Sequence, residues 1–278
     1  MQIILAGLSA LMYGTGDFCG GLASRKQDTV VVLFFSQLVG LAAALVAALA
    51  LGQPLVRTTD LLWGAAAGVT GVAGLAALYR ALASTLVAVA SPVAAVTGAV
   101  IPVFLGIAAG ERPGTLAWVG IALAVPAIAL LASGPPGHAR GGMVRRAALM
   151  GAAAGVGFGL FFFCISRTSH ASGIWPLAAA RVATLTLVTL FALVTRRSLR
   201  PRVEGLPVVL ASGALDMGAN IAFLLAARMG LLTITAVITS LYPGPTVILA
   251  MIVFREKLTV PRALGLALAL AGVACISV

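Results

Sequence analysis

The sequence predicts an all-α integral membrane protein with ten transmembrane helices. Of its 278 residues, 61% are hydrophobic and only 9% are charged, and the mean hydropathy is +1.13. A soluble protein carries about 25% charged residues because its surface faces water. This chain has too few charges to cover such a surface, so most of its outer surface must face lipid.

Ten apolar runs have the length that a membrane-spanning helix needs, which is about 20 residues. Clusters of charge, Pro and Gly separate them, and the connections are too short to form a separate soluble domain. Strands are excluded because barrel strands are about 10 residues long and alternate in polarity. The predicted spans are 2–22, 30–51, 61–82, 86–108, 115–133, 147–166, 173–195, 205–228, 231–254 and 260–278.

The two halves of the chain are similar to each other. Shifting the sequence by 145 residues places Cys19 on Cys164 and Glu111 on Glu256, with no gap. Matches of rare residues at one offset indicate a duplication. The predicted units are a first five-helix repeat at 1–133, a linker at 134–146 and a second five-helix repeat at 147–278.

The odd number of helices in each unit decides the expected geometry. Five helices begin and end on opposite faces, so the second copy must enter the membrane inverted. Inverted repeats are common in secondary transporters, which bind substrate near the midplane where the repeats meet. We therefore expect a transporter whose two halves exchange conformations and expose one site alternately.

Two segments carry a resemblance to a known family. The stretch 226–270 contains Tyr242-Pro243, then Glu256 and Gly265, and it resembles the second EamA domain of the drug/metabolite transporter superfamily. The stretch 77–131, with Glu111, resembles the end of the first domain, although Gly98 stands where a proline is expected. The resemblance implies two inverted five-helix units and a cavity lined mainly by helices 1, 3, 4, 6, 8 and 9. It also implies transport, often export, of small metabolites such as amino acids, or of toxic compounds.

Three ionisable residues lie inside predicted spans, where charge is expensive and marks candidate functional sites. They are Asp17, Arg181 and Asp216. In one interpretation an aspartate in a polar cavity changes protonation or binds a substrate amine. In the other, the charges form structural pairs, Arg181 with Asp216 and Arg80 with Asp17. The predicted substrate-binding or cavity residues are Tyr13, Asp17, Tyr79, Asp216, Asn220 and Tyr242, and the predicted structural or coupling charges are Arg80 and Arg181.

Prolines within spans and acidic residues at helix ends are candidate hinges and gate contacts. Breaks in membrane helices are tolerated where they are buried in protein or line a cavity. The fourth and ninth spans hold prolines at equivalent places of the repeat, which predicts either paired hinges or packing kinks. Glu111 and Glu256 follow helix ends beside a basic residue, so each forms a salt bridge, a helix cap or a gate contact. The predicted hinge residues are Pro92, Pro102, Pro243 and Pro245.

Other classes of function lack the residues they need. The chain has two His and three Cys in no ligand spacing, so neither a metal nor a cofactor is expected. No catalytic cluster or nucleotide-binding loop supports an enzyme or ATP drive. The net charge of +11 sits in short loops and predicts lipid interfaces rather than nucleic-acid binding. The alternatives to a transporter are a channel or a membrane-embedded enzyme. The expected partners are a small-molecule substrate, membrane lipid and a coupling proton.

Two arguments on orientation disagree. Thirteen of the 18 Lys and Arg residues fall at one face, which the positive-inside rule assigns to the cytoplasm, leaving both termini outside. The resemblance implies that both termini are cytoplasmic. We follow the charge count, because every loop is short enough for the rule to apply, and we expect a multi-pass protein of the cytoplasmic (inner) cell membrane.

Overall fold

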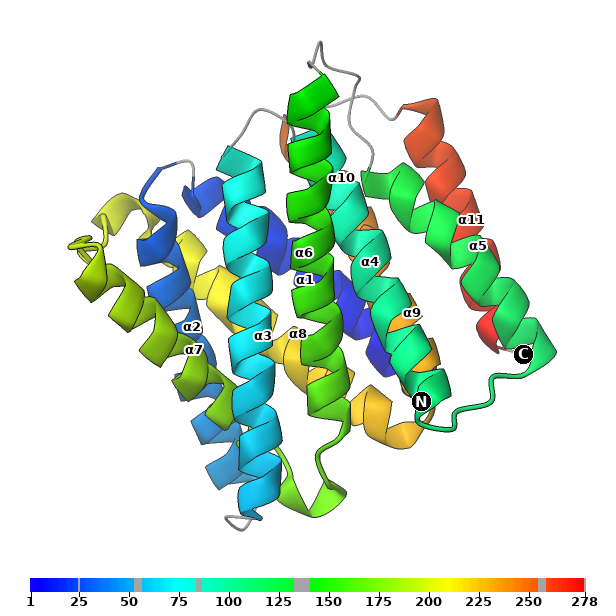
Figure 1. Cartoon of the computed structure of the whole chain (residues 1–278), viewed down its shortest axis with the longest axis horizontal. Helices are drawn as coiled ribbons and strands as arrows, with labels where there is room; N and C mark the ends of the chain where they lie inside the picture. Colours follow the sequence, from blue (N-terminus) through cyan, green and yellow to red (C-terminus); the bar gives the residue numbers. More distant parts are fainter. Residues whose placement is uncertain (25, 53–56, 84–86, 133–140, 255–258, 278) are drawn as a thin grey trace.

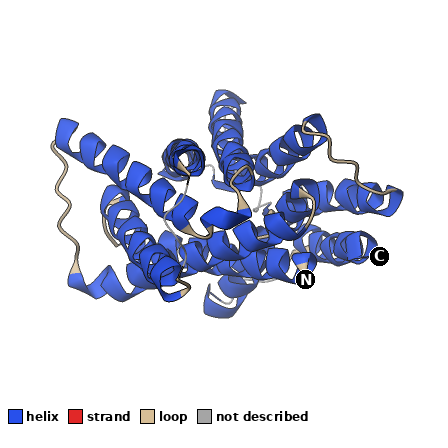
Figure 2. Cartoon of the chain, turned by 90° about the horizontal axis from the view of Figure 1, so that it is seen from below, coloured by secondary structure: helices blue, strands red, loops and turns tan. Residues whose placement is uncertain are grey.

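The structure, a computed structural model, is a bundle of helices joined by short turns (Figure 1). It describes residues 1–24, 26–52, 57–83, 87–132, 141–254 and 259–277. Within these residues Figure 2 shows helices and loops and no strand. The α-helices are α1 Gln2–Ser24, α2 Thr29–Ala50, α3 Thr58–Ala83, α4 Val87–Ala108, α5 Thr115–Ala132, α6 Gly141–Ser166, α7 Trp175–Val194, α8 Leu206–Met229, α9 Leu232–Thr239, α10 Pro243–Phe254 and α11 Val260–Ser277.

The helices have the character of membrane spans. Six of the described helices, α1, α2, α3, α6, α7 and α8, are long and apolar enough to cross a membrane, and α4, α5 and α11 contain shorter apolar stretches. Large hydrophobic side chains cover the outside of the bundle, among them Phe104 at 67% exposure and Leu270 at 73%. A surface of this kind is stable against lipid and not against water. The chain is a multi-pass membrane protein.

The predicted ninth span, 231–254, is two helices rather than one. α9 ends at Thr239 and α10 begins at Pro243, with Ser240–Tyr242 between them. The reason is the proline pair: Pro243 and Pro245 have no N–H to donate, and a proline ring collides with the carbonyl four residues earlier in a helix. In contrast, α4 runs without a break from Val87 to Ala108, through Pro102.

The predicted linker 134–146 is shorter than expected, because α6 begins at Gly141. The sequence boundary followed the apolar run, which starts after Arg146. A helix continues past its apolar part when long basic side chains can reach the interface. Arg145 and Arg146, both exposed, therefore lie inside the helix.

Small residues bring α3 and α7 into direct backbone contact. A Cβ on Gly64 would collide with the carbonyl of Pro176, and a Cβ on Gly68 would collide with that of Ala180. The two glycines are four residues apart, and so are their two partners, so one helix face meets another. This small-residue spacing permits close packing where lipid provides no hydrophobic drive. The packing of α3 on α7 at Ala180 places the next residue, Arg181, toward the centre of the bundle.

Helix contacts occur in pairs related by the repeat. The 145-residue shift converts α1 into α6 and α3 into α8, and both the α1–α8 and the α3–α6 contacts are extensive. Likewise α2–α8 corresponds to α3–α7, while α2–α7 and α5–α11 correspond to themselves. The largest buried cluster lies where α2, α3, α6, α7 and α8 meet and includes Phe161, Phe162, Leu177 and Phe223.

The bundle has two end faces. We call the end that carries both termini the terminal face; it also carries the connections 109–114, 167–174 and 230–231 (Figure 1, lower end). We call the opposite end, with the connections 26–28 and 195–205, the basic face. Both termini lying at one end is the arrangement expected of an even number of crossings.

Candidate functional site

A cavity of about 830 Å³, including its open mouth, lies inside the bundle. Helices α1, α2, α3, α4, α6, α7 and α8 and the α9–α10 break all contribute to its wall. The resemblance implied a cavity lined mainly by helices 1, 3, 4, 6, 8 and 9, and most of the lining residues lie on these helices. Gln37 of α2 and Arg181 and Thr184 of α7 are added to them.

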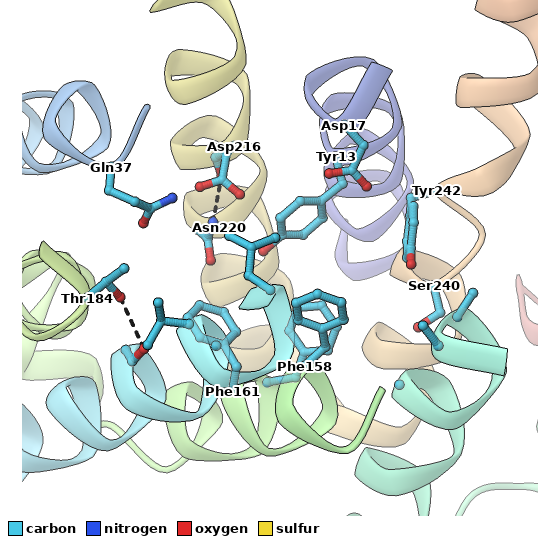
Figure 3. Close-up of a pocket in the computed structure, with 18 of the residues that line it drawn as sticks. Tyr13, Asp17, Gln37, Phe158, Phe161, Thr184, Asp216, Asn220, Ser240 and Tyr242 are labelled. Carbon is cyan, nitrogen blue, oxygen red and sulfur yellow. Dashed lines mark hydrogen bonds between the residues drawn. The ribbon is translucent and has the colours of Figure 1, made fainter. Parts of the chain in front are cut away.

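α1 supplies Tyr13 and Asp17, which are four residues apart and share one face of the helix. Figure 3 shows both side chains on the cavity side of α1. Asp17 lines the cavity, and its side chain is exposed although it lies among helices. Among the described residues the Asp17 carboxylate has no hydrogen bond or ion pair. Ser9, on the same face, is buried against α8 and donates to the Ala219 carbonyl at 2.9 Å.

A charged cluster of α2, α7 and α8 forms another part of the wall. Arg181 Nη2 lies 2.5 Å from Asp216 Oδ2, and Arg181 Nη1 donates to Gln37 Oε1 at 2.5 Å. The Arg181 side chain is 7% exposed and that of Asp216 is 30% exposed, on the cavity side. A buried charge is tolerated when it is paired and hydrogen-bonded. Of the two interpretations of Arg181, the ion pair with Asp216 is present, and the pair also lines the cavity.

Asn220 lies one turn beyond Asp216 on α8. Its Nδ2 donates to the Asp216 carbonyl at 2.6 Å (dashed in Figure 3), while its Oδ1 has no partner among the described residues. The residue is 2% exposed and lines the cavity. An unpaired acceptor in a buried position costs free energy unless another group donates to it. Asn220 Oδ1 is therefore ready to accept a hydrogen bond from a ligand.

Aromatic rings form an apolar wall that the sequence interpretation did not identify. Phe158, Phe161 and Phe162 of α6 line the cavity. Phe162 meets Tyr13 edge-on, with ring centroids 6.1 Å apart, and stacks on Phe223 at 4.3 Å. Spacings of three and four residues along α6 were a signal that these rings share a helix face. Which helix they faced was not visible from that spacing.

The break between α9 and α10 places Ser240 and Tyr242 in the cavity wall. α1 holds this break in place: Thr246 Oγ1 donates to the Gly14 carbonyl at 2.9 Å. A Cβ on Gly14 would collide with the Tyr242 carbonyl, so the backbones of α1 and of the break are in close contact. Tyr242, a predicted cavity residue, is thus fixed next to the helix that carries Asp17.

Several predicted residues are not placed in the site. The side chains of Tyr79, Arg80 and Pro92 and the residue Glu256 lie outside the described part of the structure. Pro102 is buried in α4 and does not line the cavity. Among the described residues, no group of His, Cys, Asp and Glu could hold a metal ion.

Glu111 connects the two halves at the terminal face. Its carboxylate accepts hydrogen bonds from the Leu232 N–H at 2.7 Å, the Thr233 N–H at 2.9 Å and the Thr233 hydroxyl at 2.6 Å. In this structure Glu111 caps the N-terminus of α9. A carboxylate is well placed at a helix N-terminus, where free N–H groups and the helix dipole attract negative charge.

Asp60 makes a second connection of this kind, which the sequence interpretation missed. Its carboxylate accepts hydrogen bonds from the Ser169 N–H at 3.2 Å, the Ser169 hydroxyl at 2.6 Å and the Ser172 hydroxyl. Arg228 donates to the Ser169 carbonyl at 2.8 Å. Asp60 is only 5% exposed. These contacts hold the start of α3 to the α6–α7 connection and the end of α8.

Comparison with known proteins identifies the chain's relatives. The model of the EamA-like transporter family matches residues 1–133 and again residues 145–278. A solved structure described only as "Crystal structure of protein" has a TM-score of 0.78 with this chain at 18% identity, over 98% of this chain and 94% of that one. At that identity the likeness concerns the fold alone. No curated protein matches the chain.

Proposed function

Because the chain belongs to the EamA-like transporter family, we propose that it is a secondary transporter that moves a small organic metabolite through the central cavity. The observation that carries the proposal is the position of Asp17: a carboxylate without a described partner, exposed to a cavity inside an apolar bundle. Ionisable groups at this depth mark substrate or ion pathways. Together with Asn220 and Tyr242 it forms a polar surface to which a passing solute can bind.

The proposed architecture is ten membrane spans in two inverted five-helix repeats, at 1–133 and 147–278. Three observations support it. The family matches the chain twice. The helix contacts occur in pairs that the 145-residue shift exchanges. Both termini lie at one end of the bundle. In this architecture α9 and α10 together make the ninth span, and α4, α5 and α11 are three of the others.

The proposed mechanism is alternating access between the two repeats. The contacts of Glu111 with α9 and of Asp60 with Ser169 each join a first-repeat residue to a second-repeat residue. Both lie at the terminal face, so we propose that the described conformation is closed at that face. Asp17 of α1, Gln37 of α2 and Ala94 of α4 lie in the halves of their helices nearer the basic face. We therefore propose that access to the cavity in this conformation is from the basic face.

Two further parts of the proposal concern movement and drive. We propose that the α9–α10 break, at Pro243 and Pro245, is the hinge of the second repeat, because three residues between two helices can change direction without breaking a helical hydrogen-bond ladder. We also propose that a proton gradient drives export and that Asp17 carries the proton. A carboxylate that has no cation beside it among the described residues can exchange a proton with water in the cavity. The proposed site of action is the inner cell membrane.

Transport by purified protein in liposomes tests this function. Uptake of radiolabelled amino acids, amines and sugars is measured with and without an imposed proton gradient, against liposomes without protein. The expected result is saturable uptake of one class of solute that responds to the gradient. Flux that never saturates and ignores the gradient would instead identify a channel, and no flux of any solute would reject transport.

A further inference from the structure

We propose that the substrate is a small organic cation, an amine on an aromatic or otherwise flat apolar body, rather than a zwitterionic amino acid or an anion. The proposal rests on the transport function given above and names its substrate class. Asp17 and Asn220 would hold the ammonium group, and the rings of α6 would hold the apolar body. Figure 3 shows these residues around one space.

The cavity's arginine is not available to a carboxylate substrate. Arg181 Nη1 donates to Gln37 and Nη2 to Asp216, each at 2.5 Å. The third group, Nε, has no hydrogen bond among the described residues, but it faces α2: a Cβ on Gly40 would be 3.1 Å from it. With the side chain 7% exposed, little of the guanidinium faces the cavity. An amino acid would therefore bring a carboxylate for which the described wall provides no cation.

The described wall has an excess of negative charge. Its formally charged side chains are two aspartates, Asp17 and Asp216, and one arginine, Arg181. The ion pair compensates Asp216, so Asp17 is left as the uncompensated charge. Charge in a cavity of low dielectric selects strongly for the opposite sign, because the interaction is screened little by water.

The acceptors of the cavity wall suit an ammonium group. A primary ammonium has three donors and no acceptor. Asp17 provides a carboxylate with no described partner, and Asn220 Oδ1 is a buried acceptor with no described partner. Asn220 is 2% exposed and lines the cavity, so a donor that enters the cavity can satisfy this acceptor. Two acceptors without a described partner, on the adjacent helices α1 and α8, are better matched to a donor-only group than to an anion.

The aromatic wall suits the rest of such a molecule. Phe158, Phe161 and Phe162 lie along one face of α6, and Tyr13 meets Phe162 edge-on at 6.1 Å. Ring faces attract cations and flat apolar groups. The stacking of Phe162 on Phe223 at 4.3 Å fixes the wall, so little side-chain conformational entropy is lost when a ligand binds.

Three probes that share one phenyl ring test the proposal. They are phenethylamine, phenylalanine and 3-phenylpropionate, which carry an amine, both groups and a carboxylate, respectively. Binding to the purified full-length protein in detergent is measured by isothermal titration. We expect phenethylamine to bind at least about tenfold more tightly than phenylalanine, because the carboxylate of phenylalanine would lack one charge-assisted contact in the cavity. We expect 3-phenylpropionate not to bind. Equal or tighter binding of phenylalanine or 3-phenylpropionate, or binding of none of the three, would overturn the proposal.

Variants identify the residue that recognises the amine. Asp17→Asn should weaken phenethylamine binding at least about tenfold, and Asp17→Glu should retain most of it. The matched control is Glu204→Gln, which removes an exposed carboxylate outside the cavity and should leave binding unchanged. Wild-type affinity in a monodisperse Asp17→Asn protein would overturn the proposal, and loss of binding in Glu204→Gln would show an unspecific charge effect and overturn it too.

Liposome uptake of the same probes keeps the two hypotheses distinct. Uptake of phenylalanine without uptake of phenethylamine would overturn the cation class and leave the transport function intact. Binding of phenethylamine with no flux of any solute would support the cation site and reject the transport function.

Discussion

Arg181 of α7 and Asp216 of α8 form an ion pair in the cavity wall, with Nη2 and Oδ2 2.5 Å apart. Gln37 of α2 is bonded to the same guanidinium, also at 2.5 Å, so three helices meet at one charged group. The close packing of α3 on α7 brings this group into the bundle. The two aspartates of the cavity therefore differ in their partners. Asp216 is paired with Arg181, and Asp17 has no described partner.

Asp216→Asn is expected to destabilise the protein. It leaves the Arg181 charge buried without its anion, and breaking a buried pair in this way costs about 3–5 kcal/mol. Thermal unfolding of the purified protein in detergent should show a lower midpoint. The double variant Arg181→Gln/Asp216→Asn, which removes both charges, should recover much of the loss. An unchanged midpoint in the single variant would mean that the pair has no structural role.

Asp17→Asn is expected to leave the thermal unfolding midpoint close to that of the wild type, because the carboxylate has no hydrogen bond or ion pair among the described residues. Transport should respond differently: without an ionisable group at this position, uptake should no longer depend on an imposed proton gradient. A pH-sensitive dye inside the liposomes measures substrate-induced proton movement. Proton movement at the wild-type rate in the variant would exclude Asp17 as the proton carrier.

Glu111→Gln is expected to loosen the terminal face. The carboxylate accepts three hydrogen bonds at the start of α9. Loss of its charge should weaken this contact by about 1.5–3 kcal/mol. The measurement is maleimide labelling of Ala236→Cys, a fully buried position on α9, in a background without Cys19, Cys164 and Cys275. Labelling should become several-fold faster.

The matched control for Glu111→Gln is Arg112→Gln, which removes the neighbouring exposed charge and should not change labelling at position 236. If both variants labelled at the wild-type rate, the Glu111 contacts would not hold this face closed.

Gly68→Ala is expected to cost about 1–3 kcal/mol of unfolding free energy, because its Cβ would collide with the Ala180 carbonyl on α7. The control is Gly7→Ala on α1, where a Cβ meets nothing within 4 Å. That change should be neutral or stabilising by about 0.5–1 kcal/mol, since alanine favours a helix. Thermal unfolding measures both, and equal effects of the two substitutions would contradict the close packing of α3 on α7.

Orientation in the membrane is tested at one position on each face. The charge distribution predicts that the basic face is cytoplasmic, so a cysteine at Ser198 should be protected from an impermeant reagent in intact cells. A cysteine at Arg57, at the start of α3, should label; both positions are exposed. The native cysteines are removed first. Labelling at 198 and protection at 57 would reverse the assignment and place both termini in the cytoplasm.

Features that depend on the chemistry of one segment could be predicted from the sequence. Hydropathy over about 20 residues predicts membrane helices because transfer to lipid is a property of each segment by itself. The all-helical membrane fold and the EamA-like family were predicted and are confirmed. The break before Pro243 was also predictable as a weak point, because proline lacks the N–H that a helix needs. That the break separates two helices, while α4 stays continuous through Pro102, was not predictable.

Only the tertiary structure decided which distant groups meet. The Arg181–Asp216 pair was one of two interpretations of the sequence. The structure forms that pair and adds Gln37 of α2 to it. It turned the three phenylalanines of α6 into a cavity wall, and it placed Glu111 on the N-terminus of α9 rather than on its basic neighbour. The physical reason is that spacing along a helix determines which residues share a face, whereas the identity of the facing helix depends on the fit of many side chains at once.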